Sequence, residues 1–357
     1  MSKKFYSLKP ILKRNATYNV IIGERSNGKT FACLVYALKR YFDSGQQFAY
    51  IRRWSTDVKP MRLNELFSAV VSSGVLEKLS NGRYQTIIFK TGRFYLANYN
   101  EDGKPIYSDT DVLGFAMSLN EGEHNKSISY PKVTTIIFDE FLTSNVYLEN
   151  EFVAFMNLVS TIVRQRTNVK IFMLGNTVNK YSPYFKEMGL NNVLHMKQGT
   201  IDVYTYGNSK LTVAVEYCAS TEKSKSNNYY FAFDNPKLKM ITGGKWELDI
   251  FPHKPVNFTK QDVKFIYFIE FNDMVFQAEI IFLTNQTFTF IHRKTTPIKD
   301  GSKVYSLVPN ASIFYSTSIK RPKDELEQRI YWYYTHEKVF YQDNDVGNAI
   351  QNFLKLC

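Results

Sequence analysis

Residues 23–30 read GERSNGKT and match the pattern G-x-x-x-x-G-K-[ST]. The pattern follows an apolar run at residues 18–23 and opens a stretch with helical periodicity, which is the context that a phosphate-binding loop requires. Gly23 and Gly28 let backbone N–H groups curl around phosphate oxygens, and the N-terminus of the next helix adds partial positive charge. The pattern therefore predicts a site for a nucleoside triphosphate.

The polar side chains of this loop have separate tasks in phosphate binding. Lys29 has the length to reach the β and γ phosphates, and the hydroxyl of Thr30 is a ligand for Mg²⁺. Arg25 is either a contact of the γ-phosphate or a solvated side chain, and the pattern leaves both readings open. The predicted cofactors are ATP and Mg²⁺. The predicted nucleotide-binding residues are Gly23, Arg25, Ser26, Asn27, Gly28, Lys29, Thr30 and, beyond the loop, Asn176.

A second apolar run, TIIFDE at residues 135–140, ends in two acids and is typical of a Walker B strand. Asp139 would hold Mg²⁺ together with Thr30, so these two residues are the predicted metal ligands. Glu140 would orient and deprotonate the attacking water, a task that suits a carboxylate close to the γ-phosphate. An ordinary solvated strand end is the alternative reading.

Three more polar residues stand at the ends of predicted elements. Asn176 ends an apolar run at 169–176, where an amide senses the γ-phosphate. Arg164 and Arg166 end an amphipathic stretch, where cations also favour the helix dipole, so a structural role competes with an arginine-finger role. The residues assigned to catalysis are Glu140, Arg164 and Lys29.

The elements that position these residues alternate between extended and helical patterns. A helix is predicted over 28–43, and a second by apolar residues at helical spacing, namely Phe152, Phe155, Met156, Val159, Ile162 and Val163. Strands are predicted at 18–23, 48–53, 84–89, 93–99, 112–119, 133–140 and 169–176. This alternation predicts an α/β fold.

The second half has a different pattern. Consecutive strands at 263–271, 275–284 and 287–294, followed by a helix at 346–356, predict an α+β domain. The polar segment 220–228 reads as a loop in a joining region or as a simple surface loop. The predicted domains are an ATPase domain at 1–205, a linker or lid region at 206–256 and a C-terminal domain at 257–357.

Composition excludes several function classes. Three cysteines and five histidines without ligand spacing argue against a disulfide framework or a zinc site. No apolar run reaches the roughly 18 residues that a spanning helix needs, so no membrane partner is expected. The net charge of +12 suggests a polyanionic partner, with a basic protein that is merely soluble as the alternative. Most of the excess lies in residues 1–200, which carry 26 Lys and Arg against 16 Asp and Glu.

The order of the segments IIGERSNGKT, FAYIRRW, YPKVTTIIFDEF, FMNLVSTIVRQR and FMLGNTVNKYSPYF resembles the DNA-packaging ATPases of small protein-primed tailed phages, the phi-twenty-nine type. The resemblance covers roughly the first 190 residues and is weaker beyond them. It implies an ASCE, RecA-like P-loop ATPase. It also implies a homomeric ring, usually a pentamer, that docks on the portal of an empty capsid and draws in double-stranded DNA. A scaffold RNA takes part in some relatives.

The resemblance also assigns individual residues. Arg164 matches the family's trans-acting arginine finger, which completes the site of a neighbouring subunit. The family's second trans-acting group, a lysine after the Arg-Arg pair, has no match here, and Lys59 is its substitute or the role is absent. Lys126 lies in a loop that matches one facing the central pore. It is therefore a candidate DNA contact, with a solvated lysine as the alternative.

The family's C-terminal domain looks like an RNase H-type nuclease that has lost its acidic metal cluster. Here Glu270, Asp273 and Glu279 have a spacing that does not force them together, so nuclease activity is predicted to be absent. Four basic residues of this domain either grip DNA through its phosphates or simply solvate loops; they are Arg293, Lys294, Lys320 and Arg321.

These observations predict ATP-driven translocation of viral DNA into a capsid, in the host cytoplasm and transiently at the portal vertex. Two alternatives remain open at this point. One is a terminase with an active nuclease, or another helicase-like translocase, which needs clustered acids for two metal ions. The other is a nucleotide-gated assembly factor without useful turnover, against which Glu140 argues.

Overall fold

The computed structural model describes residues 6–121, 128–143, 147–178, 181–219 and 251–357. The chain divides into two compact units, residues 1–247 and 248–357. No helix in the described ranges is long and apolar enough to cross a membrane.

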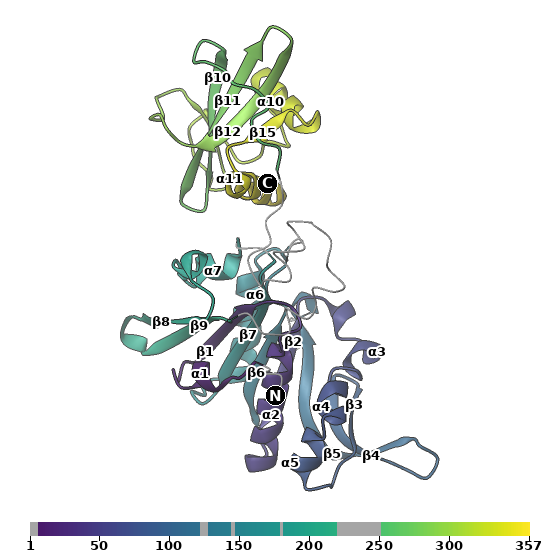
Figure 1. Ribbon diagram of the computed structural model, residues 1–357. Coiled ribbons are helices and arrows are strands. Elements are labelled where there is room, and N and C mark those ends of the chain that lie inside the picture. Colours follow the sequence, from purple (N-terminus) through teal and green to yellow (C-terminus); the bar gives the residue numbers. More distant parts are fainter. Residues whose placement is uncertain (1–5, 122–127, 144–146, 179–180, 220–250) are drawn as a thin grey trace. The chain divides into compact units, whose positions relative to one another are not determined.

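The first unit is built on a nine-stranded sheet with helices on both faces (Figure 1). Its strands are β1 (Tyr18–Gly23), β2 (Gln47–Arg52), β3 (Thr86–Lys90), β4 (Arg93–Tyr99), β5 (Pro105–Ser118), β6 (Val133–Asp139), β7 (Lys170–Asn176), β8 (Thr200–Tyr206) and β9 (Leu211–Tyr217). Their spatial order is β3-β4-β5-β2-β6-β7-β1-β9-β8. The run from β5 to β9 is parallel, and antiparallel pairs complete both ends.

The central strands are continuous apolar runs because both of their faces are covered. β1 and β6 are buried along their whole lengths. β7 lies between them, so one strand separates β1, which leads into the predicted phosphate-binding loop, from β6, which ends at Asp139. Parallel strands bring their carboxyl ends to one edge of the sheet, and that edge therefore gathers Gly23, Asp139 and Asn176.

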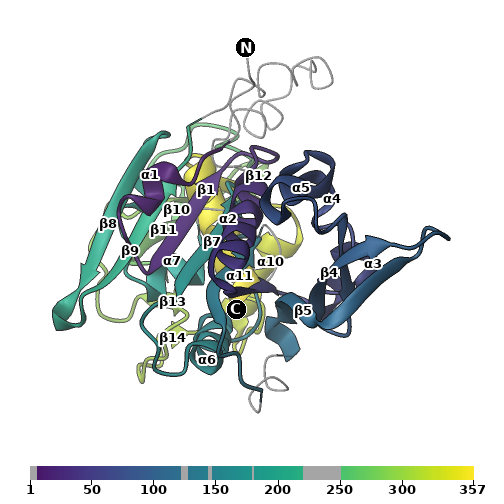
Figure 2. The same cartoon turned by 90° about the horizontal axis from the view of Figure 1, so that it is seen from below.

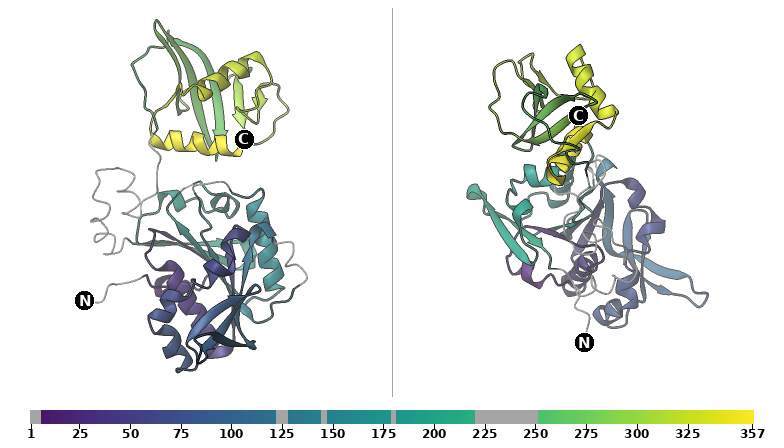
Figure 3. Two further views of the ribbon diagram at one scale, coloured as in Figure 1. Left: turned by 90° about the vertical axis from the view of Figure 1, so that its right-hand side faces the viewer. Right: turned by 45° about the horizontal axis from the view of Figure 1, so that its top comes forward.

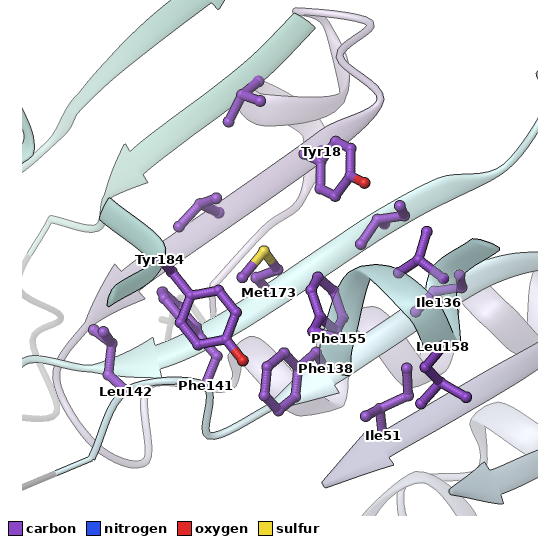
Figure 4. Close-up of a cluster of buried hydrophobic side chains, with 14 of the residues drawn as sticks. Tyr18, Ile51, Ile136, Phe138, Phe141, Leu142, Phe155, Leu158, Met173 and Tyr184 are labelled. Carbon is purple, nitrogen blue, oxygen red and sulfur yellow. The ribbon is translucent and has the colours of Figure 1, made fainter. Parts of the chain in front are cut away.

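A long helix packs on each face of this sheet. α2 (Lys29–Ser44) buries Leu34 and Leu38 on one face, and its apolar residues recur at helical spacing. α6 (Glu151–Val163) covers the other, where Phe138 of β6 stacks on Phe155 with ring centroids 5.0 Å apart (Figure 4). Short helices in the described part of this unit include α1 (Lys9–Leu12), η1 (Ser55–Asp57), α3 (Pro60–Leu63), α4 (Ser68–Ser72), α5 (Val75–Ser80), α7 (Pro183–Glu187), η3 (Val193–His195) and η4 (Gly207–Ser209).

The second unit has a six-stranded sheet in the order β14-β13-β10-β11-β12-β15. Its elements are β10 (Val263–Phe271), β11 (Met274–Leu283), β12 (Gln286–Arg293), β13 (Lys303–Ser306), β14 (Tyr315–Ser316), α10 (Glu325–Thr335), β15 (Val339–Tyr341) and α11 (Asn344–Leu356). β10 to β12 form an antiparallel meander, and β13, β14 and β15 add parallel pairs. α11 packs on β10, β12 and β15 (Figure 3). α10 is tied to β10 by a hydrogen bond between the hydroxyls of Tyr267 and Tyr334.

The structure confirms the predicted α/β fold of the first unit and differs from the sequence patterns at two places. β9 pairs in parallel with β1, so the sheet extends past residue 205, where the sequence patterns end the domain. β5 begins at Pro105, seven residues before the predicted strand at 112–119, because a polar hairpin continues the pairing with β4. The predicted loop at 220–228 lies outside the described residues.

Candidate nucleotide site

The P-loop turns sharply between β1 and α2. Gly28 has φ +95°, which favours glycine, and Ser26 also adopts a positive φ of 58°. Gly23 is required for a different reason. A Cβ at Gly23 would lie 2.8 Å from Cβ of Cys218, so the residue permits close packing of β1 against the end of β9. The loop therefore rests on the sheet at one end and opens a helix at the other.

Lys29 is buried inside this loop, where its ammonium group is surrounded by oxygen atoms. It donates to the carbonyl of Glu24 at 2.7 Å, to Oδ1 of Asn27 at 3.2 Å and to Oδ1 of Asn176 at 3.2 Å. Burial lowers the pKa of Lys29. The structure thus brings Asn176 of β7 directly to the P-loop lysine, although the two residues are far apart in sequence.

Asp139 and Thr30 form an oxygen-rich pair beside this lysine. The Thr30 hydroxyl donates to Asp139 Oδ2 at 3.1 Å and lies 3.3 Å from its Oδ1. Tyr50 of β2 donates to Asp139 Oδ2 at 3.0 Å. Burial raises the pKa of the Asp139 carboxyl. A hydroxyl and a carboxylate held together are the donor types that Mg²⁺ prefers, so these residues fit that ion.

Glu140 differs from its buried neighbour Asp139. Its side chain is 57% exposed, and its backbone has a positive φ of 59°, an uncommon conformation for this residue type that is often found at functional sites. Arg52 of β2 donates to Glu140 Oε2 at 2.5 Å and to Asp57 Oδ2 at 3.4 Å. The Glu140 carboxylate is therefore accessible and held by a single guanidinium group.

These residues surround one cavity of about 400 Å³. Its lining comes from the P-loop, the end of β6 and the end of β7, and consists of Arg25, Ser26, Asn27, Gly28, Lys29, Thr30, Phe31, Asp139, Glu140, Leu174, Gly175 and Asn176. The predicted nucleotide and metal residues thus converge on one space. Gly23 adds its carbonyl just beneath it, 3.4 Å from Nζ of Lys29.

A buried ion pair supports the loop after β6, and its members have no signal in the P-loop or Walker B patterns. Arg53 donates to Glu151 at 2.7 and 3.0 Å and to the carbonyls of Glu140 and Phe141. Tyr184 donates to Glu151 Oε1 at 2.8 Å. Two consecutive arginines at the end of an apolar strand are the visible sign in the sequence, but Glu151, the acidic partner of Arg53, lies 98 residues away.

Arg164 and Arg166 have different environments. Arg166 donates to five backbone carbonyls, those of Tyr130, Pro131, Val133, Ile162 and Val163, so it has the structural role that competes with the finger role. Arg164 is exposed and donates only one bond that the structure records, to the carbonyl of Ile128 at 3.0 Å. It lies near the start of β6, roughly 20 Å from Asp139 at the other end of that strand.

The remaining predicted contacts are spread over the chain. Lys126 lies outside the described residues. Lys59 is exposed at the start of α3. Lys294, Lys320 and Arg321 are exposed in the second unit. Arg293 pairs with Asp343 at 2.5 Å, and Asp343 also caps α11, so part of the charge of Arg293 is already neutralised.

The fold and the cavity define a P-loop nucleotide-binding core. It has a phosphate-binding loop with a lysine inside it and, two strands away in the sheet, a strand that ends at Asp139 and is followed by Glu140. The family model of the podovirus DNA encapsidation protein (Gp16) matches residues 1–297. The chain therefore belongs to the podovirus DNA encapsidation protein family.

Individual relatives agree with this assignment. The chain is 32% identical over 184 residues to the DNA packaging protein of Bacillus phage phi29, which covers 51% of this chain and 49% of the relative. It is 30% identical over 183 residues to that of Bacillus phage B103, covering 50% of each. The chain thus spans about half the length of the curated relatives it matches.

A solved structure of the bacteriophage phi29 genome packaging motor assembly is similar along 99% of both chains, with a TM-score of 0.56 and 23% sequence identity. At that level of identity the likeness concerns the fold.

Proposed function

We propose that this chain is the ATPase subunit of a homomeric ring motor that moves double-stranded viral DNA into a preformed capsid. The convergence of Lys29, Thr30, Asp139 and Glu140 on one cavity carries this proposal. Membership of the DNA encapsidation family and relatives named DNA packaging protein support the substrate. The site of action is the portal vertex, in the host cytoplasm.

The residues of the cavity have roles that follow from their positions. Lys29 would bind the phosphates through its charge, and the backbone N–H groups of the loop would donate further hydrogen bonds to the phosphate oxygens. Thr30 and Asp139 would hold Mg²⁺, which neutralises phosphate charge when bound. Asn176 senses the γ-phosphate; the hydrogen bond that it accepts from Lys29 supports this role. Glu140 accepts the proton of the attacking water as general base.

Arg164 acts on a neighbouring copy. Its place near the start of β6 puts it far from the Asp139 of its own chain, so a finger role requires a second subunit. Its exposure and its single recorded bond leave it able to reach out. This supports a ring, and the family resemblance favours a pentamer docked on the portal, with a scaffold RNA in some relatives.

The second unit serves as a DNA-binding domain of RNase H-like type without nuclease activity. An antiparallel meander extended by parallel strands supports that fold. Glu279 of β11 lies opposite Ile266 of β10, and Ile266 is four residues from Glu270 on the same strand. Glu279 also accepts a hydrogen bond from Gln277 and lies 3.4 Å from Nε2 of His292. The two acids are therefore about 13 Å apart along the strand, too far to share a metal ion. Exposed Lys294, Lys320 and Arg321 supply salt-sensitive phosphate contacts.

The nucleotide site is tested by binding of a fluorescent ATP analogue with and without Mg²⁺. We expect Lys29→Ala to weaken binding at least about tenfold, which is the loss of one charge-assisted contact. Glu140→Gln should bind as tightly as the wild type, since the carboxylate acts on water. Equal binding by Lys29→Ala and the wild type would contradict the assignment.

A DNA cleavage assay with Mg²⁺ or Mn²⁺ tests the proposed absence of nuclease activity. Cleaved DNA would contradict it.

A further inference from the structure

The hairpin between β4 and β5 extends beyond the rest of the sheet. β3 pairs with β4 only as far as Ala97, and β2 pairs with β5 only from Gly114 onward. Residues 98–106 therefore form a two-stranded ribbon without a third strand, and it projects from the first unit (Figures 1 and 2). Such ribbons are at best marginally stable alone in water, so a partner surface that covered this one would stabilise it.

We call residues 98–111 the acidic arm. The arm contains four acidic residues, Glu101, Asp102, Asp109 and Asp111. Cations near the arm include Lys104 in the tip, Lys90, which donates to the Tyr107 hydroxyl at the base, and Arg83, whose carbonyl accepts a hydrogen bond from Asn98. Its apolar side chains are also exposed, with Tyr99 at 52% and Ile106 at 57%. An acidic surface repels nucleic acid, so the arm fits a protein surface that is cationic and partly apolar.

Such a surface lies at the other end of the same sheet, where β8 is the edge strand. Lys9 is exposed at the start of α1, and the exposed Lys13 and Arg14 follow the end of that helix. Positions 6 to 17 contain no acidic residue. Lys210 is exposed in the turn between β8 and β9. We call these four cations and Val203 the basic edge.

Val203 places an apolar group on the same side of the sheet as α1. It is 47% exposed, and Ile201, two residues earlier on β8, packs on the core that also contains Leu8 and Ile11. Residues two apart on a strand face the same way. Figure 2 shows the β4–β5 hairpin and the edge strand β8 at opposite ends of the sheet of the first unit. The acidic arm and the basic edge therefore lie at opposite ends of that sheet.

We propose that the acidic arm of one copy docks on the basic edge of the next, head to tail. Two different surfaces on opposite sides of a subunit make a heterologous contact, which closes into a ring when the rotation between copies permits. The inference rests on the ring proposed above and names the surfaces that hold it. Charge complementarity within the same chain selects a second copy as the occupant.

Self-association of the full chain tests this contact, measured by sedimentation equilibrium at about 50 mM and about 500 mM salt, since screening weakens rim charges. Three charge-reversal variants are compared: the arm variant Glu101→Lys with Asp102→Lys, the edge variant Lys9→Glu with Lys13→Glu, and a chain carrying all four changes. A control, Asp43→Lys with Glu65→Lys, makes the same charge change as the arm variant at other exposed positions.

We expect the arm and edge variants each to weaken self-association by about tenfold or more at low salt, because like charges then face each other. The chain with all four changes should associate within about threefold of the wild type, and so should the control. Restoration by the combined chain excludes misfolding as the cause of the single losses.

Two results would overturn the proposal: a wild type that stays monomeric at every concentration, or a combined chain that stays as weak as the arm variant. The proposal is also contradicted if the edge variant weakens DNA binding and leaves self-association unchanged. The same holds if the arm variant weakens only a contact with a portal protein. In either case the partner of that surface is not a second copy of this chain. Binding of the ATP analogue, followed in every variant, reports separately on the nucleotide site. Loss of self-association with normal nucleotide binding would leave the P-loop assignment intact.

Discussion

The guanidinium of Arg52 lies 2.5 Å from Oε2 of Glu140, and it joins the end of β2 to the residue that follows β6. Because Glu140 is exposed, such a pair contributes on the order of 1 kcal/mol or less to stability. It is therefore weak enough to open during a catalytic cycle. While the ion pair is formed, the guanidinium of Arg52 is hydrogen-bonded to Oε2 of Glu140. That oxygen is then not available to accept a proton from water as a general base.

Replacement of Arg52 tests this hold. We expect Arg52→Gln to raise ATP turnover of the isolated protein about two- to fivefold, corresponding to roughly 0.4–1 kcal/mol, and to reduce the further stimulation by DNA. The matched control is Arg62→Gln, because Arg62 is an exposed partner of Asp57 that does not contact Glu140. Steady-state ATPase assays give both values. A fall in turnover as deep as that of Glu140→Gln would show that Arg52 is needed for chemistry instead.

Glu151→Gln tests the buried support of the Walker B loop. The change leaves Arg53, which is only 5% exposed, without its counter-charge, and we expect a loss of about 3 kcal/mol in the free energy of unfolding. Urea denaturation measures it. Glu149→Gln, at an exposed neighbouring position, should change stability by less than about 0.5 kcal/mol. Equal stability of the two variants would mean that the pair does not hold the loop.

Arg164→Ala and Arg166→Ala should fail in different ways. Arg166→Ala exposes or orphans several carbonyls and should lower stability by about 2 kcal/mol or more. Arg164→Ala should keep wild-type stability and nucleotide binding but lose most of its turnover. Mixing Arg164→Ala with Glu140→Gln subunits should restore activity, because each mixed interface can pair an intact arginine with an intact glutamate. Failure of this complementation would remove the trans-acting role.

The second unit contains a buried carboxylate that gives a pH-dependent prediction. Burial by itself would raise the pKa of Glu327, but hydrogen bonds from Lys303, Ser316 and the backbone N–H of Lys323 outweigh it, so the pKa is lowered from 4.5. A lowered pKa contributes stability above the unfolded-state value, and this stability is lost as pH falls through the folded-state value.

The stability difference between the wild type and Glu327→Gln should therefore shrink as pH is lowered from about 6 toward 3. Urea denaturation across this pH range measures it. Glu325→Gln on the exposed face of the same helix is the control and should show no such trend. A difference that is constant with pH would contradict an ionised Glu327.

Local patterns were enough to predict the P-loop, the strand that ends at Asp139 and the helix after Gly28, because each has a strict spacing and a continuous apolar run. They also predicted Asn176 beside the nucleotide loop, since parallel strands end at one edge. The meander of the second unit followed from its turns.

Other features depend on contacts that no local pattern encodes. Arg53 gives no sign of its partner Glu151, because the fold alone brings them together. The polar part of β5 lacks the alternation of a half-buried strand, since much of it faces water on both sides. β9 lies within the predicted linker region 206–256. The turn-like residues before it do not indicate that it pairs with β1.

In the proposed motor, ATP hydrolysis at Glu140 is coupled to double-stranded DNA. Steady-state ATPase rates of the wild type and Glu140→Gln, with and without double-stranded DNA at low and high salt, test it most directly. We expect DNA to stimulate the wild type alone and high salt to remove the stimulation, since the contacts are to phosphates. Wild-type turnover that DNA leaves unchanged in every condition, or DNA-stimulated turnover by Glu140→Gln, would contradict it.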